Sequence, residues 1–346
     1  MTRRGKNTMD DTKAVAAYEQ YLQSEENILE VRHLKKYFPI KGDLVLKKNY
    51  VKAVDDVSFS IKKGTTMGLV GESGCGKTTV GRTILRLHSV TDGQVLFQGR
   101  DLATLNKKGL RTLRPKLQMI FQDPYSSLSP RMPVGEIIGE AVKVHHIVPK
   151  NQYRDYILKI MHDCGLQTQY YYRYPHEFSG GQRQRICIAR AVALNPDLII
   201  CDEPVSALDV SIQAQIINLM KDLQEQRGYT YLFISHDLSV VEHISDTIGV
   251  MYLGNLVETG DKKRIFSNPM HPYTRALLSA VPMPDPDYKM KRIILKGDIP
   301  SPANPPEGCK FCTRCPKCME VCTKIKPVFK EYEPGHFTAC HLYPQD

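Results

Sequence analysis

A glycine-rich stretch constrains the fold of this chain more than any other feature. Residues 71–78 run Gly-Glu-Ser-Gly-Cys-Gly-Lys-Thr, which is a glycine, four residues and then Gly-Lys-Thr. The stretch follows the apolar run 67–70 and precedes a helix-like segment at 79–87. Glycines let backbone N–H groups curve around a phosphate, and a following helix directs its positive end toward the same anion. The pattern therefore predicts a P-loop at the end of a buried strand.

The chemistry of this loop rests on two side chains. Lys77 is long enough to reach the β- and γ-phosphates of a nucleotide, and the hydroxyl of Thr78 can ligate Mg²⁺. Cys75 is interpreted as a bystander, because no neighbouring base would activate its thiol. The loop residues predicted to contact ATP are Gly71, Ser73, Gly74, Cys75, Gly76, Lys77, Thr78 and Thr79.

Further continuous apolar runs, at 198–201 and 231–234, alternate with helix-like segments. This alternation is typical of a parallel sheet covered on both faces. Asp202 and Glu203 follow the first of these runs, where Asp202 can hold Mg²⁺ and Glu203 can polarise the attacking water. His236 follows the second run and is predicted to sense the γ-phosphate. Gln122, after a further apolar run at 119–121, is predicted to reach Mg²⁺ and the attacking water.

A second phosphate-binding turn is predicted at residues 178–182, Phe-Ser-Gly-Gly-Gln, just before a helix-like stretch. Small residues at a helix start offer free N–H groups, a hydroxyl and the positive end of the helix dipole. A γ-phosphate bound within a single chain does not need two such turns. In two protomers placed head to tail, the second turn of one protomer can close over the ATP bound by the phosphate loop of the other. The predicted ATP contacts here are Ser179, Gly180, Gly181 and Gln182.

Together with residues 206–209, Ser-Ala-Leu-Asp, these motifs resemble the Walker A, Q-loop, signature, Walker B, D-loop and H-switch of ABC ATPases over about residues 28–265. The resemblance implies a RecA-like P-loop NTPase core of the α/β class with an antiparallel β subdomain and a helical insert. It also implies an aromatic residue stacked on adenine, for which Phe38 is chosen with Tyr37 as its rival. Phe178 departs from the leucine usual in the signature.

Residues 121–128, 271–278 and 297–302 narrow the resemblance to the dipeptide/oligopeptide branch of ABC importers. Such an ATPase subunit usually works with a second, homologous ATPase subunit, two membrane-spanning permease subunits and an extracytoplasmic substrate-binding protein. The expected location is the cytoplasmic face of the cell membrane. Related systems carry nickel, glutathione or sugars, so these cargoes stay open beside peptides.

Six of the ten cysteines fall between Cys309 and Cys340. In a reducing compartment such a cluster indicates metal binding before disulfides. The importer family's pattern implies ligation of a 4Fe–4S cluster by four of them, with zinc as the alternative. Because the cluster also contains Cys312 and Cys318, which four of the six cysteines bind the metal stays open. The implied ligands are Cys309, Cys315, Cys322 and Cys340.

The predicted organisation is an N-terminal extension at 1–27, expected to be loose, an ATPase domain at 28–265 with a helical subdomain at about 130–182, and a Cys-rich metal-binding extension at 266–346.

The net charge of +10 comes from scattered Lys and Arg, which favours a solvated surface over a nucleic-acid partner. A soluble ABC ATPase acting on nucleic acid or ribosomes, and an iron–sulfur redox protein with a regulatory ATPase, are the rival interpretations.

Overall fold

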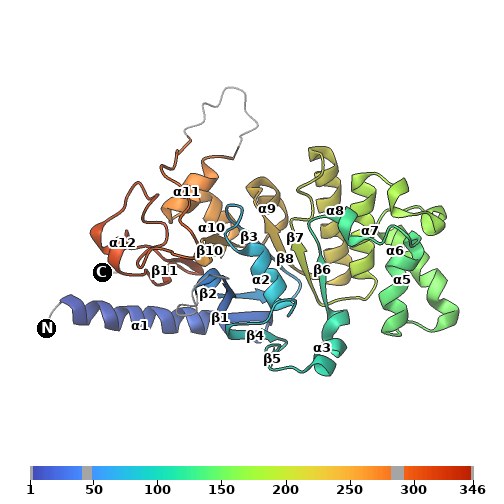
Figure 1. The fold of residues 1–346 in the computed structure, drawn as a ribbon, viewed down its shortest axis with the longest axis horizontal. Helices are drawn as coiled ribbons and strands as arrows, with labels where there is room; N and C mark the ends of the chain where they lie inside the picture. Colours follow the sequence, from blue (N-terminus) through green and yellow to red (C-terminus); the bar gives the residue numbers. More distant parts are fainter. Residues whose placement is uncertain (1–2, 41–48, 282–291, 344–346) are drawn as a thin grey trace. The chain divides into compact units, whose positions relative to one another are not determined.

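The computed structural model describes residues 3–40, 49–281 and 292–343, whose helices and strands are drawn in Figure 1. The chain divides into two compact units. Unit 1 comprises Met1–Ile61, Met67–Ala103 and His236–Asp346, and unit 2 comprises Lys62–Thr66 and Thr104–Ser235. These units differ from the three segments drawn from the sequence, whose boundaries stay a prediction.

Unit 1 contains an antiparallel sheet of order β2-β1-β4-β5. It also contains a strand run of order β11-β12-β10-β9-β3, in which only β3 and β9 pair in parallel. The strands are β1 (Asn27–Pro39), β2 (Tyr50–Lys62), β3 (Thr66–Val70), β4 (Asp92–Phe97), β5 (Arg100–Asp101), β9 (Thr247–Tyr252), β10 (Asn255–Asp261), β11 (Lys330–Glu333) and β12 (His336–Thr338). The helices are α1 (Arg3–Leu22), α2 (Lys77–Ile84), α9 (Leu238–Ile244), α10 (Lys262–Ser267), α11 (Pro272–Leu278) and α12 (Glu320–Lys324).

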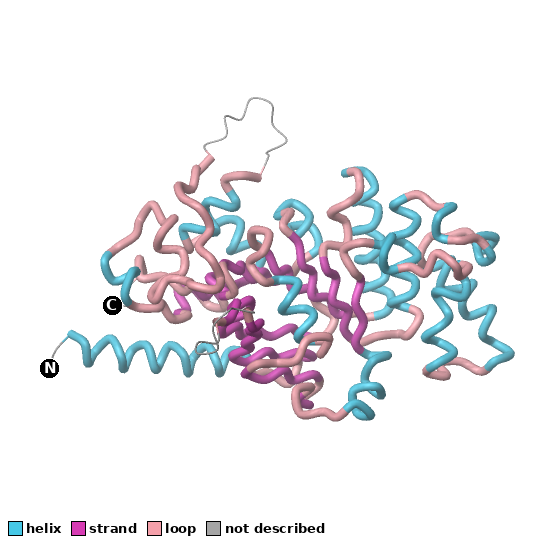
Figure 2. The backbone as a smooth tube through the Cα atoms, viewed as in Figure 1, coloured by secondary structure: helices cyan, strands magenta, loops and turns pink. Residues whose placement is uncertain are grey.

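Unit 2 contains a parallel strand run of order β8-β7-β6. Its strands are β6 (Leu117–Ile120), β7 (Leu198–Asp202) and β8 (Thr230–Ser235), and its α-helices are α3 (Lys107–Leu113), α4 (Pro124–Ser127), α5 (Val134–Val144), α6 (Tyr153–Asp163), α7 (Gly180–Val192) and α8 (Val210–Arg227). Every residue of β7 and β8 is buried, as a sheet covered on both faces requires. The stretch between β6 and β7 is drawn in Figure 2 as helices joined by loops, which agrees with the expected helical insert.

The N-terminal region differs from the loose extension expected from its polar composition. Arg3–Leu22 form α1, whose Tyr18 and Leu22 are buried with Phe337. Residues four apart lie on one face of a helix, so two apolar side chains suffice to make a small docking stripe. The Tyr18 hydroxyl also donates to the Ser58 carbonyl oxygen at 2.7 Å. The partner of the stripe, Phe337, lies more than three hundred residues away in sequence, so local periodicity could not reveal it.

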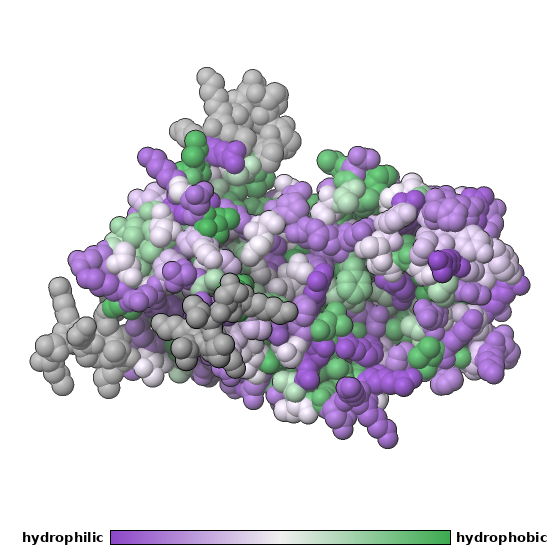
Figure 3. All heavy atoms as spheres, in the orientation of Figure 1, coloured by the Kyte–Doolittle hydropathy of each residue, from purple (hydrophilic) through white to green (hydrophobic). Residues whose placement is uncertain are grey.

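Hydrophilic and hydrophobic side chains are interspersed on the face shown in Figure 3. Among the residues that the structure describes, no helix combines the length and the apolar character that a membrane crossing requires.

Candidate functional site

The phosphate loop, defined as residues 71–78, connects β3 to α2 in unit 1. Gly76 is the residue before α2 and has φ = 107°, in the left-handed region that L side chains rarely adopt. A Cβ on Gly76 would lie 2.2 Å from the carbonyl oxygen of Ala53, and one on Gly71 would lie 2.2 Å from that of Met251. The loop is therefore packed directly against the backbone of neighbouring segments, and only glycine fits at these two positions.

Lys77 is buried and folds back over the phosphate loop. Its Nζ donates to the carbonyl oxygens of Gly71, at 2.7 Å, and of Glu72, at 3.0 Å. A bound phosphate would compete for this ammonium group at the centre of the loop. Burial raises the pKa of the Cys75 thiol, although Lys77 opposes the shift, so Cys75 stays protonated at neutral pH. This agrees with its interpretation as a bystander.

The other predicted loop residues occupy the positions that the pattern implies. Ser73 and Gly74 lie in the turn itself, while Thr78 and Thr79 lie in the first turn of α2. The N–H groups of a first helical turn point toward the start of the helix, which is the end that favours an anion.

The two candidates for adenine stacking, Tyr37 and Phe38, are adjacent in β1. The Tyr37 hydroxyl donates to Asp55 Oδ1, and burial together with this carboxylate raises the pKa of Tyr37. Phe38 is half-buried, contacts the ring of His88 edge-on at a centroid distance of 5.4 Å, and has Lys36 Nζ 4.8 Å from its centroid. The hydroxyl of Tyr37 is held by Asp55, whereas Phe38 is held through contacts of its ring, and the stacking role of Phe38 stays a prediction.

Unit 2 brings Gln122 and Glu203 together from positions 81 residues apart. Gln122 Nε2 donates to Glu203 Oε2 at 2.9 Å, and the Glu203 N–H donates to the Ile234 carbonyl oxygen at 2.9 Å. Asp202, at the end of β7, is fully buried. Glu203 has φ = 47°, a left-handed conformation that costs a non-glycine residue about 1–3 kcal/mol and is concentrated at functional sites. A carboxylate held by an amide in this way is suited to accept a proton from water.

The second phosphate-binding turn begins α7. The Ser179 hydroxyl accepts from the Gln182 N–H at 3.4 Å, and the Gln182 side-chain oxygen accepts from the Ser179 N–H at 3.0 Å, which together form a capping box. A Cβ on Gly181 would lie 2.5 Å from Ile212 Cγ2. Phe178 is buried and contacts Tyr170 edge-on at 5.3 Å, so an apolar side chain larger than leucine is accommodated here.

The predicted D-loop and H-switch both adjoin strand ends. The turn at 206–209 leads from Glu203 into α8, and the Ser206 hydroxyl donates to the Glu203 carbonyl oxygen at 3.1 Å. His236 follows β8 and precedes α9. His236, Phe38 and the phosphate loop belong to unit 1, whereas Gln122, Asp202, Glu203 and residues 179–182 belong to unit 2.

The C-terminal cysteines lie near one another in unit 1 without forming a recognisable metal site. The Cys309 N–H donates to the Cys322 carbonyl oxygen at 2.8 Å. Burial raises the pKa of Cys309 to about 12 and that of Cys340 to about 11, with other thiols of the cluster adding to both shifts. Within 3–40, 49–281 and 292–343, no group of three or more His, Cys, Asp or Glu side chains is arranged to hold a metal ion. The four-thiolate prediction is thus not supported by this geometry.

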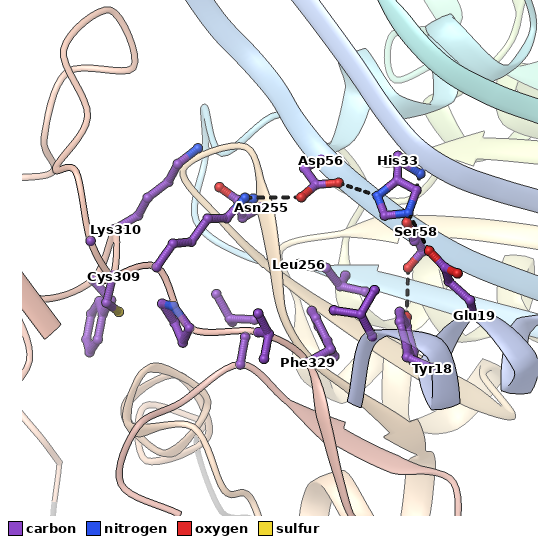
Figure 4. Close-up of a pocket in the computed structure, with 18 residues that line it drawn as sticks. Tyr18, Glu19, His33, Asp56, Ser58, Asn255, Leu256, Cys309, Lys310 and Phe329 are labelled. Atoms are coloured by element: carbon purple, nitrogen blue, oxygen red, sulfur yellow. Dashed lines mark hydrogen bonds and ion pairs between the residues drawn. The ribbon is translucent and has the colours of Figure 1, made fainter. Parts of the chain in front are cut away.

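A pocket of ≈ 210 Å³ lies in unit 1 among α1, the antiparallel sheet and the C-terminal segment (Figure 4). His33 lies on its wall and binds two acids, Asp56 through Nδ1 at 2.7 Å and Glu19 through Nε2 at 3.0 Å. Lys326 Nζ lies 3.2 Å from Asp56, and Lys310 Nζ donates to Asp55 at 2.8 Å. The lysines that line the pocket are therefore each paired with an acid, and the contacts connect the C-terminal segment to the rest of unit 1.

Sequence reasoning missed two contacts to the phosphate loop. Tyr273 and Arg314 both bind Glu72, which had been assigned no role. Tyr273 belongs to the segment 271–278 that carried the family resemblance, so a signal was present, but its partner 201 residues away was not readable.

Two family descriptions match the chain. "ABC transporter" matches residues 54–206, and "Oligopeptide/dipeptide transporter, C-terminal region" matches residues 257–322. Among curated proteins, the chain is 56% identical over 324 residues to the oligopeptide transport ATP-binding protein AppF of Bacillus subtilis (strain 168), covering 92% of this chain and 98% of AppF. It is 49% identical over 322 residues to the dipeptide transport ATP-binding protein DppF of Escherichia coli (strain K12), covering 93% and 96% respectively.

Among solved structures, the ATP-binding cassette MJ0796, described as a dimer in a post-hydrolysis state bound to ADP and Pi, resembles the chain with a TM-score of 0.61. The two are 26% identical, and the match covers 68% of this chain and 98% of the cassette. The similarity to the solved cassette leaves about a third of the chain unmatched, whereas the curated relatives match nearly all of it.

Proposed function

The chain belongs to the ABC transporter family as the ATP-binding subunit of an oligopeptide/dipeptide importer, and from this premise we propose how its residues bind and hydrolyse ATP. The phosphate loop holds the β- and γ-phosphates, with Lys77 neutralising their charge. Thr78, Gln122 and Asp202 hold Mg²⁺, and Phe38 stacks on adenine. The tight packing of Gly71 and Gly76 supports the loop assignment, because it fixes the backbone N–H groups that face the anion.

Glu203 is the proposed general base for the attacking water. The observation that carries this proposal is the 2.9 Å contact between Gln122 and Glu203, which holds the carboxylate in one orientation. Glu203 accepts a proton as the water oxygen bonds to the γ-phosphorus, while the bond from that phosphorus to the β–γ bridging oxygen breaks and ADP leaves; His236 contacts the γ-phosphate. Oriented groups of this kind accelerate phosphoryl transfer by positioning and charge stabilisation rather than by covalent chemistry.

The second phosphate-binding turn, residues 178–182, is called the signature turn from here on. We propose that it acts on a nucleotide bound by a partner subunit. Ser179, Gly180, Gly181 and Gln182 of one ATPase subunit close over ATP held by the phosphate loop of a second, homologous ATPase subunit. The solved cassette MJ0796, which is described as a dimer, offers an analogy for this arrangement. ATP thereby joins the two subunits, and hydrolysis releases them, so that the nucleotide drives a change between two transporter conformations.

The remaining partners are proposed from the family. Two membrane-spanning permease subunits would bind this pair of ATPases at the cytoplasmic face of the cell membrane, and an extracytoplasmic protein would deliver the substrate. The names of AppF and DppF favour oligopeptides or dipeptides as cargo. Nickel, glutathione or sugars are the alternative cargoes, and no nucleic-acid partner is proposed.

Metal binding by Cys309, Cys315, Cys322 and Cys340 is kept as a separate proposal that rests on family resemblance. No step of ATP hydrolysis passes through it. A 4Fe–4S cluster would give an absorption band on the order of 400 nm in protein purified without air, whereas zinc would leave the protein colourless. Protein purified without air that contains neither iron nor zinc would exclude both.

Two variants test the ATPase assignment in the reconstituted transporter. Glu203→Gln should bind ATP with the parental Kd and lose steady-state hydrolysis by at least about 100-fold, because only the proton acceptor changes. Lys77→Ala should lose nucleotide binding as well, because the buried ammonium group is removed. Stimulation of ATPase activity by each candidate cargo would identify the substrate. Normal hydrolysis in Glu203→Gln would remove Glu203 as the base.

A further inference from the structure

The C-terminal region of this chain contacts the phosphate loop directly, through Glu72. The Glu72 N–H donates to the Tyr273 hydroxyl at 2.8 Å, and the Glu72 carboxylate accepts from Arg314 Nη1 at 2.8 Å. The Glu72 carbonyl oxygen in turn accepts from Lys77 Nζ at 3.0 Å. Backbone N–H, side chain and carbonyl of one loop residue are thus all bound, two of them by residues 201 and 242 positions away.

An aromatic cluster that includes Tyr273 packs beside these contacts. Tyr252, Tyr273 and Phe311 are all buried, with ring centroids separated by 4.8 Å, 5.1 Å and 5.4 Å. These separations fall in the range of favourable edge-to-face and tilted ring contacts. Tyr252 ends β9, Tyr273 lies in α11, and Phe311 lies in the Cys-rich segment. The cluster therefore holds three segments of unit 1 together beside the loop.

The Cys-rich segment is anchored immediately before Arg314. Lys310 Nζ binds Asp55 Oδ2 at 2.8 Å and the Leu253 carbonyl oxygen at 3.0 Å, and its side chain is only 8% exposed. Figure 4 shows Lys310 and Cys309 at one end of the pocket. With Lys310 and Phe311 both fixed, the backbone that carries Arg314 has little freedom. The Arg314 side chain is 10% exposed, so water screens its contact with Glu72 only weakly.

We propose that Arg314 and Tyr273 are positioning residues that hold the phosphate loop in its nucleotide-binding shape, so that the C-terminal region sets the affinity for ATP. The inference rests on the proposed function, in which this loop binds ATP. Arg314 fixes the Glu72 side chain, and Tyr273 fixes the Glu72 N–H. Lys77 contacts the same residue, so a displaced Glu72 changes where the ammonium group lies before the nucleotide arrives. Neither positioning residue touches the nucleotide in this proposal.

The test uses the full-length chain and compares ATP affinity with turnover. Arg314→Met keeps much of the side-chain length and removes the charge, and Glu72→Gln removes the partner charge with an isosteric group. Each should raise the Kd and KM for Mg-ATP about tenfold, the order of effect expected from loss of one charge-assisted hydrogen bond. The kcat at saturating ATP should change less than about twofold, because a positioned loop affects binding rather than the chemical step.

A double-mutant cycle and a matched control separate positioning from general destabilisation. The Glu72→Gln/Arg314→Met double variant should be no worse than Arg314→Met, since both substitutions act on the contact between Glu72 and Arg314. Arg314→Lys should recover part of the affinity. Lys326→Met is the control: it breaks another ion pair of the C-terminal segment, with Asp56 at 3.2 Å, and should leave KM unchanged.

The outcomes distinguish this inference from the ATPase assignment. Unchanged Kd and KM in both single variants, with parental hydrolysis retained, would overturn the positioning role while leaving the ATPase role intact. An equal rise in KM in Lys326→Met would also overturn it, because the effect would then follow from loosening the segment anywhere. If Arg314→Met fails to fold, the isosteric Glu72→Gln variant and Arg314→Lys still decide the question.

Discussion

The two predicted phosphate-binding turns of this chain are stabilised in opposite ways. The phosphate loop of unit 1 is surrounded by residues distant in sequence, including Ala53, Met251 and Tyr273. The signature turn of unit 2 is closed mainly by its own residues, through the reciprocal bonds of Ser179 and Gln182. A loop held by distant segments can respond to what happens in those segments. A turn closed by its own capping box keeps its shape wherever its helix moves.

This difference suits the proposed roles of the two turns. In the proposed mechanism the phosphate loop holds the nucleotide, so its affinity can be set by the C-terminal region that contacts it. In the same proposal the signature turn presents its N–H groups to a nucleotide on another subunit, and it has to present the same groups each time the two subunits meet. A locally determined structure meets that requirement without help from the rest of the chain.

The largest loss of nucleotide affinity is expected from Gly76→Ala. The new Cβ would lie 2.2 Å from the Ala53 carbonyl oxygen, at a residue with φ = 107°. Backbone strain of about 1–3 kcal/mol and a steric overlap of similar size should displace the loop. Equilibrium binding of a fluorescent ATP analogue should weaken at least about 100-fold, while CD should show an unchanged helix content.

Gly74→Ala is the matched control for Gly76→Ala. Gly74 also has a positive φ, of 78°, but no atom lies within 4 Å of the position of its Cβ. Because Gly74 is itself predicted to contact ATP, this variant adds backbone strain and any overlap with the nucleotide, but no overlap with Ala53. Equal losses of affinity in the two variants would mean that the packing against Ala53 is unimportant, and the loop would then resemble the locally determined turn.

The next test concerns His271, which supports the phosphate loop through α11. His271 Nδ1 accepts from the Tyr273 N–H at 3.1 Å, and burial lowers the pKa of His271 from 6.5 to about 4, against the opposing effect of Glu258. A lowered folded-state pKa stabilises the protein at neutral pH and loses this contribution as the pH falls from about 6.5 to about 4. The free energy of unfolding should decrease by roughly 2–3 kcal/mol over this window.

His271→Asn checks that assignment, because asparagine can still cap α11 but does not titrate. Urea unfolding of both proteins between pH 7 and pH 4 gives the difference. The variant should lose less stability on acidification than the parent. Parallel curves would show that His271 is not the titrating group, and that the acid sensitivity belongs to other carboxylates or histidines.

The same comparison explains what the sequence could and could not predict. The phosphate loop, the buried strands β7 and β8, and the helix that begins after Ser179 depend on short patterns, and each was predicted near its position, whereas the capping box at Ser179 was not predicted. Glu72 had no predicted role, because its partners Tyr273 and Arg314 lie in distant parts of the chain. Helix α1 was missed for the same reason, since Tyr18 and Leu22 form a core only with Phe337.

The site residues show the same difference between features set by short sequence patterns and features set by distant segments. The contact between Gln122 and Glu203 follows from parallel strands that end at one edge of a sheet, whereas the roles of both residues in ATP hydrolysis stay a prediction. The cysteine prediction used spacing and resemblance alone. Ligand geometry depends on how the segments around Cys309, Cys315, Cys322 and Cys340 fold together, which spacing does not determine.

A smaller effect is expected from Ser179→Ala. Loss of an N-cap hydroxyl typically destabilises a helix by about 1 kcal/mol, and the remaining Gln182 bond to the Ser179 N–H survives. Thermal or urea unfolding should detect this change. The affinity of the same chain for an ATP analogue should be unchanged, because the phosphate loop of unit 1 is held by other segments. Weakened nucleotide binding would show that the two turns are not independent within one chain.

The smallest effect is expected from Phe178→Leu, which installs the residue usual in the signature. Phe178 is buried against Tyr170 at 5.3 Å, so leucine loses one ring contact but keeps an apolar side chain in the same place. The destabilisation should stay below about 1.5 kcal/mol, and the ATPase rate of the assembled transporter should stay within about twofold of the parent. Phe178→Ala, which leaves a cavity, should cost about 3–5 kcal/mol by the same urea measurement. If leucine costs as much as alanine, the Tyr170 contact rather than apolar bulk maintains the turn, and the turn would depend on its neighbours more than its capping box suggests.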